Sequence, residues 1–352
     1  MTLNELPLDA RNAKIRQVVA ILPGSQPYLC RRPLNVNKGN HGKTLLGFLC
    51  DRLPHIDLET WRQKIDEGMI IQQRCGTSVA PDFTTPGLSA AVSPDQIVQA
   101  GQIFEHLVPR TIEPDVNANI TVLFESQGLI AVNKPAPLPM HASGRFCKNT
   151  LQHILSLVYP EKPPLIVHRL DANTSGVVLL ACDRATARHI QNEFEQRAVQ
   201  KTYIAQVHGH PREDRFSCDA PIARQPAEQG LRGVDLQFGL NAVTHFEVLS
   251  RHEDGTSFLR ASPVTGRTNQ IRIHLWHLGF PIVGDPAYLK NGCLGTNRTL
   301  SVSEPQLCLH AHSIFIATKT KGMRPQGCGP DSQIFFAPLP PWAENLKLSN
   351  VP

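Results

Sequence analysis

Short apolar segments with the alternation or the β-branched composition of strands dominate the chain from residue 120 onward. The predicted strands cover residues 121–124, 128–133, 177–181, 201–207, 243–249, 257–261, 307–316 and 334–339. The run 177–181 is apolar throughout, which is typical of a buried central strand. Because the strands are many, the long helices are few and no strand–helix–strand series recurs, the pattern indicates the α+β class.

Helical spacing is confined to a few segments with recognisable ends. The predicted helices are residues 45–53, which Pro54 closes, the segment from Asp57 to Gly68, a helix that Thr150 caps, one from Asp183 through Phe194, and one that starts at Thr265 or Thr268 and stops at Gly279.

The chain divides into segments of different composition. Proline and glycine interrupt the beginning of the chain, and a proline-containing stretch without periodicity precedes the strand-rich part. Two further strands are predicted at residues 69–73 and 97–104, the second passing through Gly101. The predicted organisation is an irregular segment 1–40, a small domain 41–107, a linker 108–119, a main domain 120–342 and a tail 343–352.

Composition indicates a soluble protein. The 352 residues are 41% hydrophobic and 18% charged, and the nine cysteines are scattered without a CxxC pair. An odd, dispersed set of cysteines and the lack of a signal-like start predict a cytoplasmic protein with reduced thiols. The net charge of +5 is a mild bias toward a polyanionic partner such as RNA.

A dense cluster of polar side chains precedes the buried strand at 177–181. Residues 168–176 read HRLDANTSG, so a turn rich in donors and acceptors feeds the strand. One interpretation is a turn whose polar groups satisfy local backbone groups, with Arg169 and Asp171 forming a solvated pair. The other is a fixed carboxylate on a rigid sheet, which is where catalytic groups tend to lie.

Resemblance to a known family decides between these interpretations. HRLDANTSG is similar, without a gap, to the signature HRLDxxTSG of the RluA-type RNA pseudouridine synthases. Further likenesses are LIAVNKPAP, with Pro137 where glycine is commoner, the KxY motif at 201–203, TGRTNQIRIHLWHLGFPIVGDPAY, with Asn269 in place of the usual histidine, and the closing LHA and FFAPLP segments. The resemblance spans residues 120–342 and implies the family's mixed, mainly antiparallel sheet with flanking helices.

The small domain at 41–107 resembles, in its order of elements, the S4-type RNA-binding domain that precedes many RluA-type catalytic domains. Residues 73–94 are longer and richer in proline, glycine and serine than that domain needs. A helical adaptor packed on the main domain is the other interpretation, and both remain open.

The resemblance also implies a set of site residues. Asp171 is the catalytic carboxylate, acting as nucleophile or as base at the sugar, Arg267 is its charged partner, and Tyr203 stacks on the uracil and assists the proton step. Arg169 enters the space that a flipped nucleotide vacates. Further contacts for RNA binding and base flipping are expected from His168, Thr174, Arg272 and Lys134. The family is mostly monomeric and uses no cofactor and no metal, so a zinc interpretation of His274, His277, His310 and His312 is rejected.

Two other classes of function were weighed. A catalytically silent RNA-binding or ribosome-associated factor would be expected to lack Asp171, Tyr203 or Arg267, and all three are present. A hydrolase would need an oxyanion hole or a positioned base, and neither motif is found. The sequence therefore predicts an RNA pseudouridine synthase, an isomerase that acts on rRNA or tRNA, without distinguishing the two RNAs.

Overall fold

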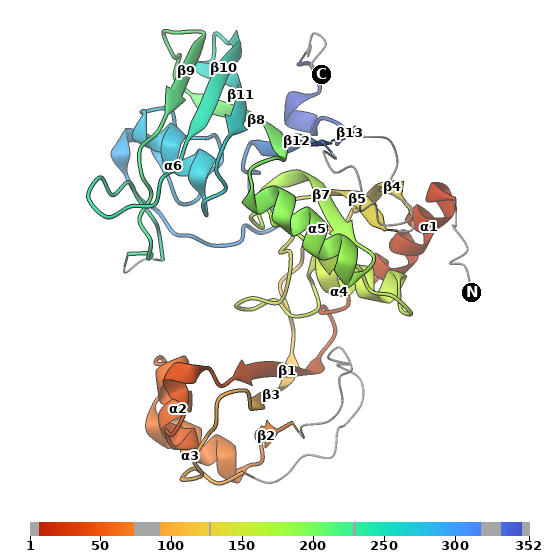
Figure 1. The fold of residues 1–352 in the computed structure, drawn as a ribbon, viewed down its shortest axis with the longest axis vertical. Helices are drawn as coiled ribbons and strands as arrows, with labels where there is room; N and C mark the ends of the chain where they lie inside the picture. Colours follow the sequence, from red (N-terminus) through yellow and green to blue (C-terminus); the bar gives the residue numbers. More distant parts are fainter. Residues whose placement is uncertain (1–6, 74–91, 127, 228–229, 318–331, 347–352) are drawn as a thin grey trace. The chain divides into compact units, whose positions relative to one another are not determined.

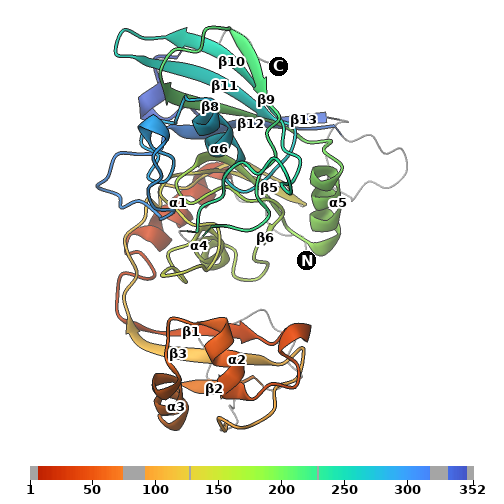
Figure 2. The same cartoon turned by 90° about the vertical axis from the view of Figure 1, so that its left-hand side faces the viewer.

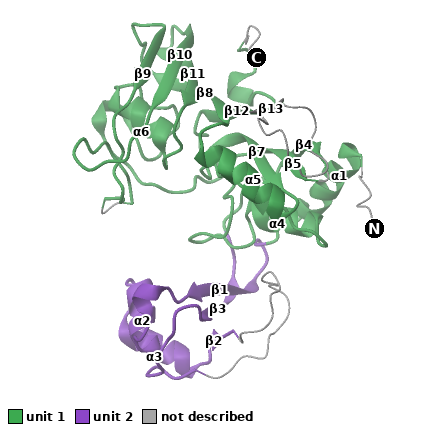
Figure 3. Ribbon diagram, in the orientation of Figure 1, with its two compact units in different colours: residues 1–23, 114–352 green, residues 24–113 purple. Residues whose placement is uncertain are grey.

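The computed structural model describes residues 7–73, 92–126, 128–227, 230–317 and 332–346. The chain forms two compact units, one made of residues 24–113 and the other of residues 1–23 and 114–352 (Figure 3). Each unit is described by itself. No helix among the described residues is long and apolar enough to cross a membrane.

The smaller unit is a three-stranded antiparallel sheet with two helices. Its strands are β1 (Tyr28–Asn35), β2 (Ile70–Gln72) and β3 (Ile103–Thr111), in the order β1-β3-β2, and its helices are α2 (Leu45–Arg52) and α3 (Leu58–Asp66). Asp57 accepts a hydrogen bond from the backbone N–H of Thr60, which confirms the predicted N-cap of the second helix.

Several expectations for this region are wrong. The segment predicted to be irregular contains α1 (Leu8–Val19) and β1, and residues 1–23 belong to the larger unit. The strand predicted at 97–104 begins only at Ile103, because Gly101 adopts a positive φ of 92° and turns the chain. The predicted linker starts too early, since β3 continues to Thr111. Most of the segment 73–94 lies outside the described residues.

The larger unit is built on one sheet, which has ten strands within the described residues. The strands are β4 (Thr121–Glu125), β5 (Leu129–Lys134), β6 (Leu165–Ile166), β7 (Ser175–Ala181), β8 (Gln200–His208), β9 (Arg215–Cys218), β10 (Thr244–Arg251), β11 (Thr256–Pro263), β12 (Leu309–Ala317) and β13 (Ser332–Phe336). The main path is β4-β5-β7-β12-β8-β11-β10-β9, with β6 on β7 and β13 on β12. Among the described pairings β7–β12 is parallel and the others are antiparallel, which confirms the predicted α+β class with a mixed, mainly antiparallel sheet (Figures 1 and 2).

Three further helices belong to this unit: α4 (Leu151–Val158), α5 (Arg184–Glu195) and α6 (Gln270–His277). The first two begin at their predicted caps, with Thr150 and Asp183 each accepting a backbone hydrogen bond three residues on. The predicted start of the third is wrong, because Asn269 and neither threonine precedes its first turn. Short 3-10 turns cover Lys38–Asn40, Lys290–Gly292 and Pro341–Ala343.

The apolar run of β7 is explained by burial on both of its faces. Val178 and Leu180 belong to a core cluster that includes Ile15 of α1 and Ile154 of α4. The alternate residues Val177, Leu179 and Ala181 belong to a second cluster that includes Ala187 and Ile190 of α5. Because the strand has no solvent-facing side, its sequence shows no polar alternation.

Candidate active site

A cavity of about 560 Å³ opens where the turn before β7 approaches β8 and the segment before α6. Its size lies within the range of about 300–1,000 Å³ that is typical of ligand pockets. The residues at its wall include His168, Arg169, Asp171, Thr174, Tyr203 and Arg267. The structure therefore brings six of the eight predicted site residues to one cavity.

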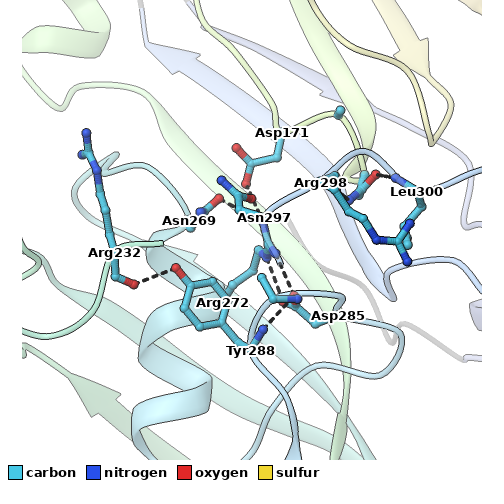
Figure 4. Close-up of polar contacts among 12 residues, drawn as sticks. Asp171, Arg232, Asn269, Arg272, Asp285, Tyr288, Asn297, Arg298 and Leu300 are labelled. Carbon is cyan, nitrogen blue, oxygen red and sulfur yellow. Dashed lines mark hydrogen bonds and ion pairs between the residues drawn. The ribbon is translucent and has the colours of Figure 1, made fainter. Parts of the chain in front are cut away.

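The turn that carries Asp171 is fixed by hydrogen bonds at that residue and at the two residues that follow it. The backbone N–H of Thr174 donates to the carbonyl of Asp171 at 3.1 Å, and the N–H of Leu138 donates to the carbonyl of Ala172 at 2.8 Å. The side chain of Asn173 donates to the carbonyl of Arg298 and accepts from the N–H of Leu300 (Figure 4). The predicted polar turn is thus anchored to two distant segments, and its carboxylate side chain is 28% exposed.

Arg272, and not Arg267, is the cation beside Asp171. Its Nη1 lies 3.7 Å from Asp171 Oδ2, and the Arg272 side chain is only 3% exposed. Arg267 lines the cavity but donates through Nε to the carbonyl of Asn241 at 3.1 Å. The predicted partner is therefore wrong: Arg272 lies on the first turn of α6, while Arg267 precedes the helix.

The guanidinium of Arg272 donates hydrogen bonds to two side chains, and Figure 4 shows both beside it. Nε and Nη2 donate to the two carboxylate oxygens of Asp285, both at 2.7 Å, and Nη1 donates to Asn269 Oδ1 at 3.0 Å. Burial opposes the charge of Arg272, but the hydrogen bonds and charge of Asp285, together with the charge of Asp171, leave its pKa raised above the ordinary value. The cation is therefore permanent and fixed in direction.

Asn269, at the position where the resemblance expects a histidine, forms a side-chain hydrogen bond with Arg272. Its φ of 57° and ψ of 17° place it in the left-handed region, which asparagine tolerates better than most residues. Its side chain is buried and accepts from Arg272. The substitution is therefore compatible with both the backbone turn and the arginine contact.

Tyr203 faces the same cavity from β8. Its ring packs against core clusters that include Ala311 on one side and Ala261 on the other. Burial and then the nearby Asp171 carboxylate raise the pKa of Tyr203 above its ordinary value. The phenol accordingly stays protonated at neutral pH and is available as a hydrogen-bond donor.

His168 and Thr174 line the cavity from well-packed positions. The ring of His168 stacks on Phe194, and its Nε2 accepts from the N–H of Leu179 at 2.8 Å. Burial lowers the pKa of His168 to about 3, and the charge of Lys201 acts in the same direction, so the ring is neutral. Thr174 is 2% exposed. Both residues support the turn that bears Asp171.

The structure contradicts the RNA contact predicted for Lys134. The side chain is fully buried, and Nζ donates to the carbonyls of Pro135, Leu138 and Ala172 at 3.0, 2.9 and 3.3 Å. Burial lowers the pKa of Lys134 to about 7, whereas the charge of Asp171 acts to raise it. Lys134 therefore ties the proline-containing segment to the turn that bears Asp171 and cannot reach a phosphate in solvent.

Two residues of this region were missed by the sequence reasoning. Lys201 lines the cavity two residues before Tyr203, so strand alternation places both on one face. Asp285 belongs to the GDPAY segment and is buried against Arg272. The motif spacing contained a signal for Lys201, but nothing local indicated the partner of Asp285.

Two of the four histidines considered for zinc have hydrogen-bond partners within the protein. His274 uses both ring nitrogens, with Nδ1 3.0 Å from Thr244 Oγ1 and Nε2 3.0 Å from the carbonyl of Ala220. His310 Nδ1 lies 2.9 Å from Ser175 Oγ. Within the described part of the chain, no group of three or more histidine, cysteine or acidic side chains is arranged to hold a metal ion.

Comparisons with known proteins identify relatives of this chain. Residues 128–277 match the family model described as RNA pseudouridylate synthase. The chain is 34% identical over 189 residues, 53% of this chain and 91% of the relative, to the dual-specificity RNA pseudouridine synthase RluA of Yersinia pestis. It is 35% identical, over 56% of this chain and 68% of the relative, to an uncharacterised RNA pseudouridine synthase of Bacillus subtilis (strain 168).

A solved structure shares the fold. The human RNA pseudouridylate synthase domain containing 4 protein superposes with a TM-score of 0.50 and 25% identity, covering 65% of this chain and 94% of that chain. One identification follows from the signature turn, from the cavity that its residues line and from the sequence relatives. This chain belongs to the RluA-type family of RNA pseudouridine synthases, which are isomerases.

Proposed function

We propose that this protein converts specific uridines to pseudouridine in a structured RNA, either large-subunit rRNA or tRNA, with Asp171 as the catalytic carboxylate. The observation that carries the proposal is the place of Asp171, on a fixed turn at the cavity wall and 3.7 Å from the buried Arg272. The name of the Yersinia pestis relative, a dual-specificity enzyme, supports keeping both RNA classes as candidates.

The reaction requires no net oxidation, reduction or added group. The bond between N1 of uracil and C1′ of ribose breaks, the base turns, and C5 forms the new bond to C1′. C5 then loses its proton and N1 takes one up, so that the product is an isomer of the substrate. Asp171 acts at the sugar, either by attacking C1′ or by removing a proton, and Arg272 stabilises its charge. Burial disfavours the ionised form of any carboxylate, so a fixed guanidinium partner is needed for either role.

Tyr203 is proposed to stack on the uracil and to assist the loss of the C5 proton. Its ring forms part of the cavity wall, and its phenol is protonated at neutral pH because burial raises its pKa. A phenylalanine in this position would retain stacking but would remove the hydroxyl that takes part in the proton step.

Arg169 is proposed to fill the space left by a flipped nucleotide. Its side chain is exposed at the cavity wall, two residues before Asp171 in the sequence. Unstacking a base costs a few kcal/mol, and a planar guanidinium stacked on neighbouring bases offsets part of that cost.

Cations around the cavity supply contacts for the RNA backbone. Arg197, Lys201 and Arg267 line it together with Arg169, while Glu195 is the acidic residue on the same wall besides Asp171. Burial lowers the pKa of Lys201, and its ammonium has a long contact of 3.5 Å to the carbonyl of Thr265. An incoming phosphate oxygen would give this ammonium a stronger partner.

The smaller unit is proposed to act as an S4-like RNA-binding domain. Its support is the order of α2, α3 and β2 and the exposed cations Lys38, Arg52 and Arg62. In the full-length protein, a double change of Arg52 and Arg62 to glutamate is expected to weaken RNA binding. Unchanged affinity would favour the adaptor interpretation.

The central test is pseudouridine mapping by carbodiimide-adduct primer extension. Unmodified total RNA would be treated with the purified protein, and the Asp171→Asn variant would serve as the control. A new stop that appears only with the wild type identifies the RNA and the modified position together. If no stop appears while RNA binding is intact, the protein is an RNA-binding factor instead.

A further inference from the structure

Arg272 is shared unequally between two carboxylates. Its Nε and Nη2, the edge best suited to a two-pronged contact, donate to Asp285 at 2.7 Å each. Asp171 receives a single approach of Nη1 at 3.7 Å. The arginine therefore donates its paired N–H groups to Asp285, although both carboxylates lie near the same guanidinium.

Asp285 is itself fixed by the backbone that follows it. Its Oδ1 accepts from the N–H groups of Ala287 at 2.8 Å and Tyr288 at 3.1 Å, and its side chain is completely buried. The ring of Tyr288 lies 5.2 Å from Arg272 Cζ. Figure 4 shows this arrangement on the side of the guanidinium that faces away from Asp171. The position of Arg272 is thus fixed by Asp285 on the side of the guanidinium that faces away from Asp171.

The geometry points to Asp285 as a positioning residue for the reaction: it holds Arg272 close enough to Asp171 to stabilise its charge but prevents a two-pronged ion pair that would occupy both carboxylate oxygens. This inference rests on the proposed role of Asp171. Each carboxylate oxygen keeps a second lone pair even in a two-pronged arginine pair, but charged hydrogen bonds to both oxygens would make each of them less nucleophilic and less basic. The charge of Asp171 also acts to raise the pKa of the Lys134 ammonium and of the Tyr203 phenol.

The test is Asp285→Asn in the full-length protein. Asparagine keeps one acceptor oxygen but presents an N–H₂ to an arginine donor, so the guanidinium turns toward Asp171. Because small misplacements of a reacting group are costly, we expect kcat to fall by about 100-fold. The KM for RNA is expected to stay within about threefold, since Asp285 does not reach the cavity.

A matched control separates positioning from loss of stability. Arg11 and Glu125 form a second part-buried, two-pronged pair in the same unit, at 3.0 and 2.8 Å, and neither residue lines the cavity. Glu125→Gln therefore removes the same kind of contact elsewhere. We expect it to lower the melting temperature without lowering kcat.

A double-mutant cycle shows whether Asp285 acts through Arg272. Arg272→Lys keeps the positive charge but lacks the planar guanidinium. In this background, Asp285→Asn is expected to lower the single-turnover rate by less than about threefold further, because the effects of substitutions at two interacting residues do not add. A full further loss in that background, or a kcat loss in Glu125→Gln equal to that in Asp285→Asn, would overturn the inference.

A crystal structure of the Asp285→Asn variant provides a readout that does not depend on activity. We expect Arg272 to move from 3.7 Å to direct hydrogen-bond distance from Asp171. An unmoved guanidinium rejects the positioning role. If the wild-type protein forms no pseudouridine, the proposed function is rejected instead. The crystal structure then still shows whether Asp285 fixes the position of Arg272.

Discussion

Gly176 packs directly against the backbone of Ala311, where β7 and β12 pair in parallel. A Cβ atom added at Gly176 would lie 2.1 Å from the carbonyl oxygen of Ala311, and the glycine has a φ of 117°. The turn that bears Asp171 enters the sheet at this point. The final glycine of the signature is therefore required by the close approach of two strands.

Gly176→Ala is expected to destabilise the larger unit by more than about 4 kcal/mol, because both the backbone conformation and the contact with Ala311 are incompatible with a side chain. Gly233→Ala is the matched control, since nothing lies within 4 Å of its added Cβ. Chemical denaturation of both variants measures the difference. Similar stability of the two would contradict the close approach.

Asp171→Asn is expected to abolish turnover while RNA affinity changes by less than about threefold, because the substitution removes charge at the cavity wall but little contact area. Pseudouridine quantification and a binding titration of the same preparation check the two parts. Activity retained by this variant would remove Asp171 from the catalytic role.

Arg169→Ala is expected to reduce activity on a structured RNA more than on a single-stranded RNA of the same sequence, because only the structured target must lose stacking. The measurement is kcat/KM on the two substrates. Arg188→Ala, an exposed residue of α5 away from the cavity wall, serves as the control. Equal losses on both substrates would argue against a flipping role.

Lys201→Gln is expected to weaken RNA binding and to reduce the slope of log affinity against log salt by about 0.7–0.9, the value for one phosphate contact. The exposed Lys162, which does not line the cavity, gives the control Lys162→Gln. Titrations at several salt concentrations measure both slopes. An unchanged slope in Lys201→Gln would show that this ammonium meets no phosphate.

His310 is expected to make the protein less stable in acid. Burial lowers the pKa of His310 to about 4 and the neighbouring His312 acts in the same direction, so between pH 6.5 and 4 the unfolded chain binds a proton that the folded chain does not. Stability is therefore present above pH 6.5 and is lost as the pH falls toward 4.

The size of this effect is about 2 kcal/mol between pH 7 and pH 5 for a shift of this extent. The asparagine of His310→Asn cannot titrate. In urea denaturation, the difference in free energy of unfolding between wild type and variant should therefore be smaller at pH 5 than at pH 7 by that amount. A difference in the free energy of unfolding that is independent of pH would mean that folding does not lower the pKa of this ring.

The local pattern of the sequence determined most of the helices and strands and the turn that bears Asp171, but it missed α1, β1 and β9. Helix caps such as Asp57, Thr150 and Asp183 act over three residues, and the apolar run before Cys182 requires burial, so each is readable without the fold. The signature likewise placed Asp171 and Tyr203 in the candidate site, and both lie at one cavity.

Only the tertiary structure decided which charges meet. Arg267 and Arg272 stand five positions apart in one motif, and the left-handed turn at Asn269 determines which of them points at a carboxylate on a turn far away in the sequence. Lys134 looked like a phosphate ligand until packing buried it among three carbonyls. Side-chain type and spacing are local properties, whereas burial and the choice of ion-pair partner depend on long-range packing, which the local sequence does not encode.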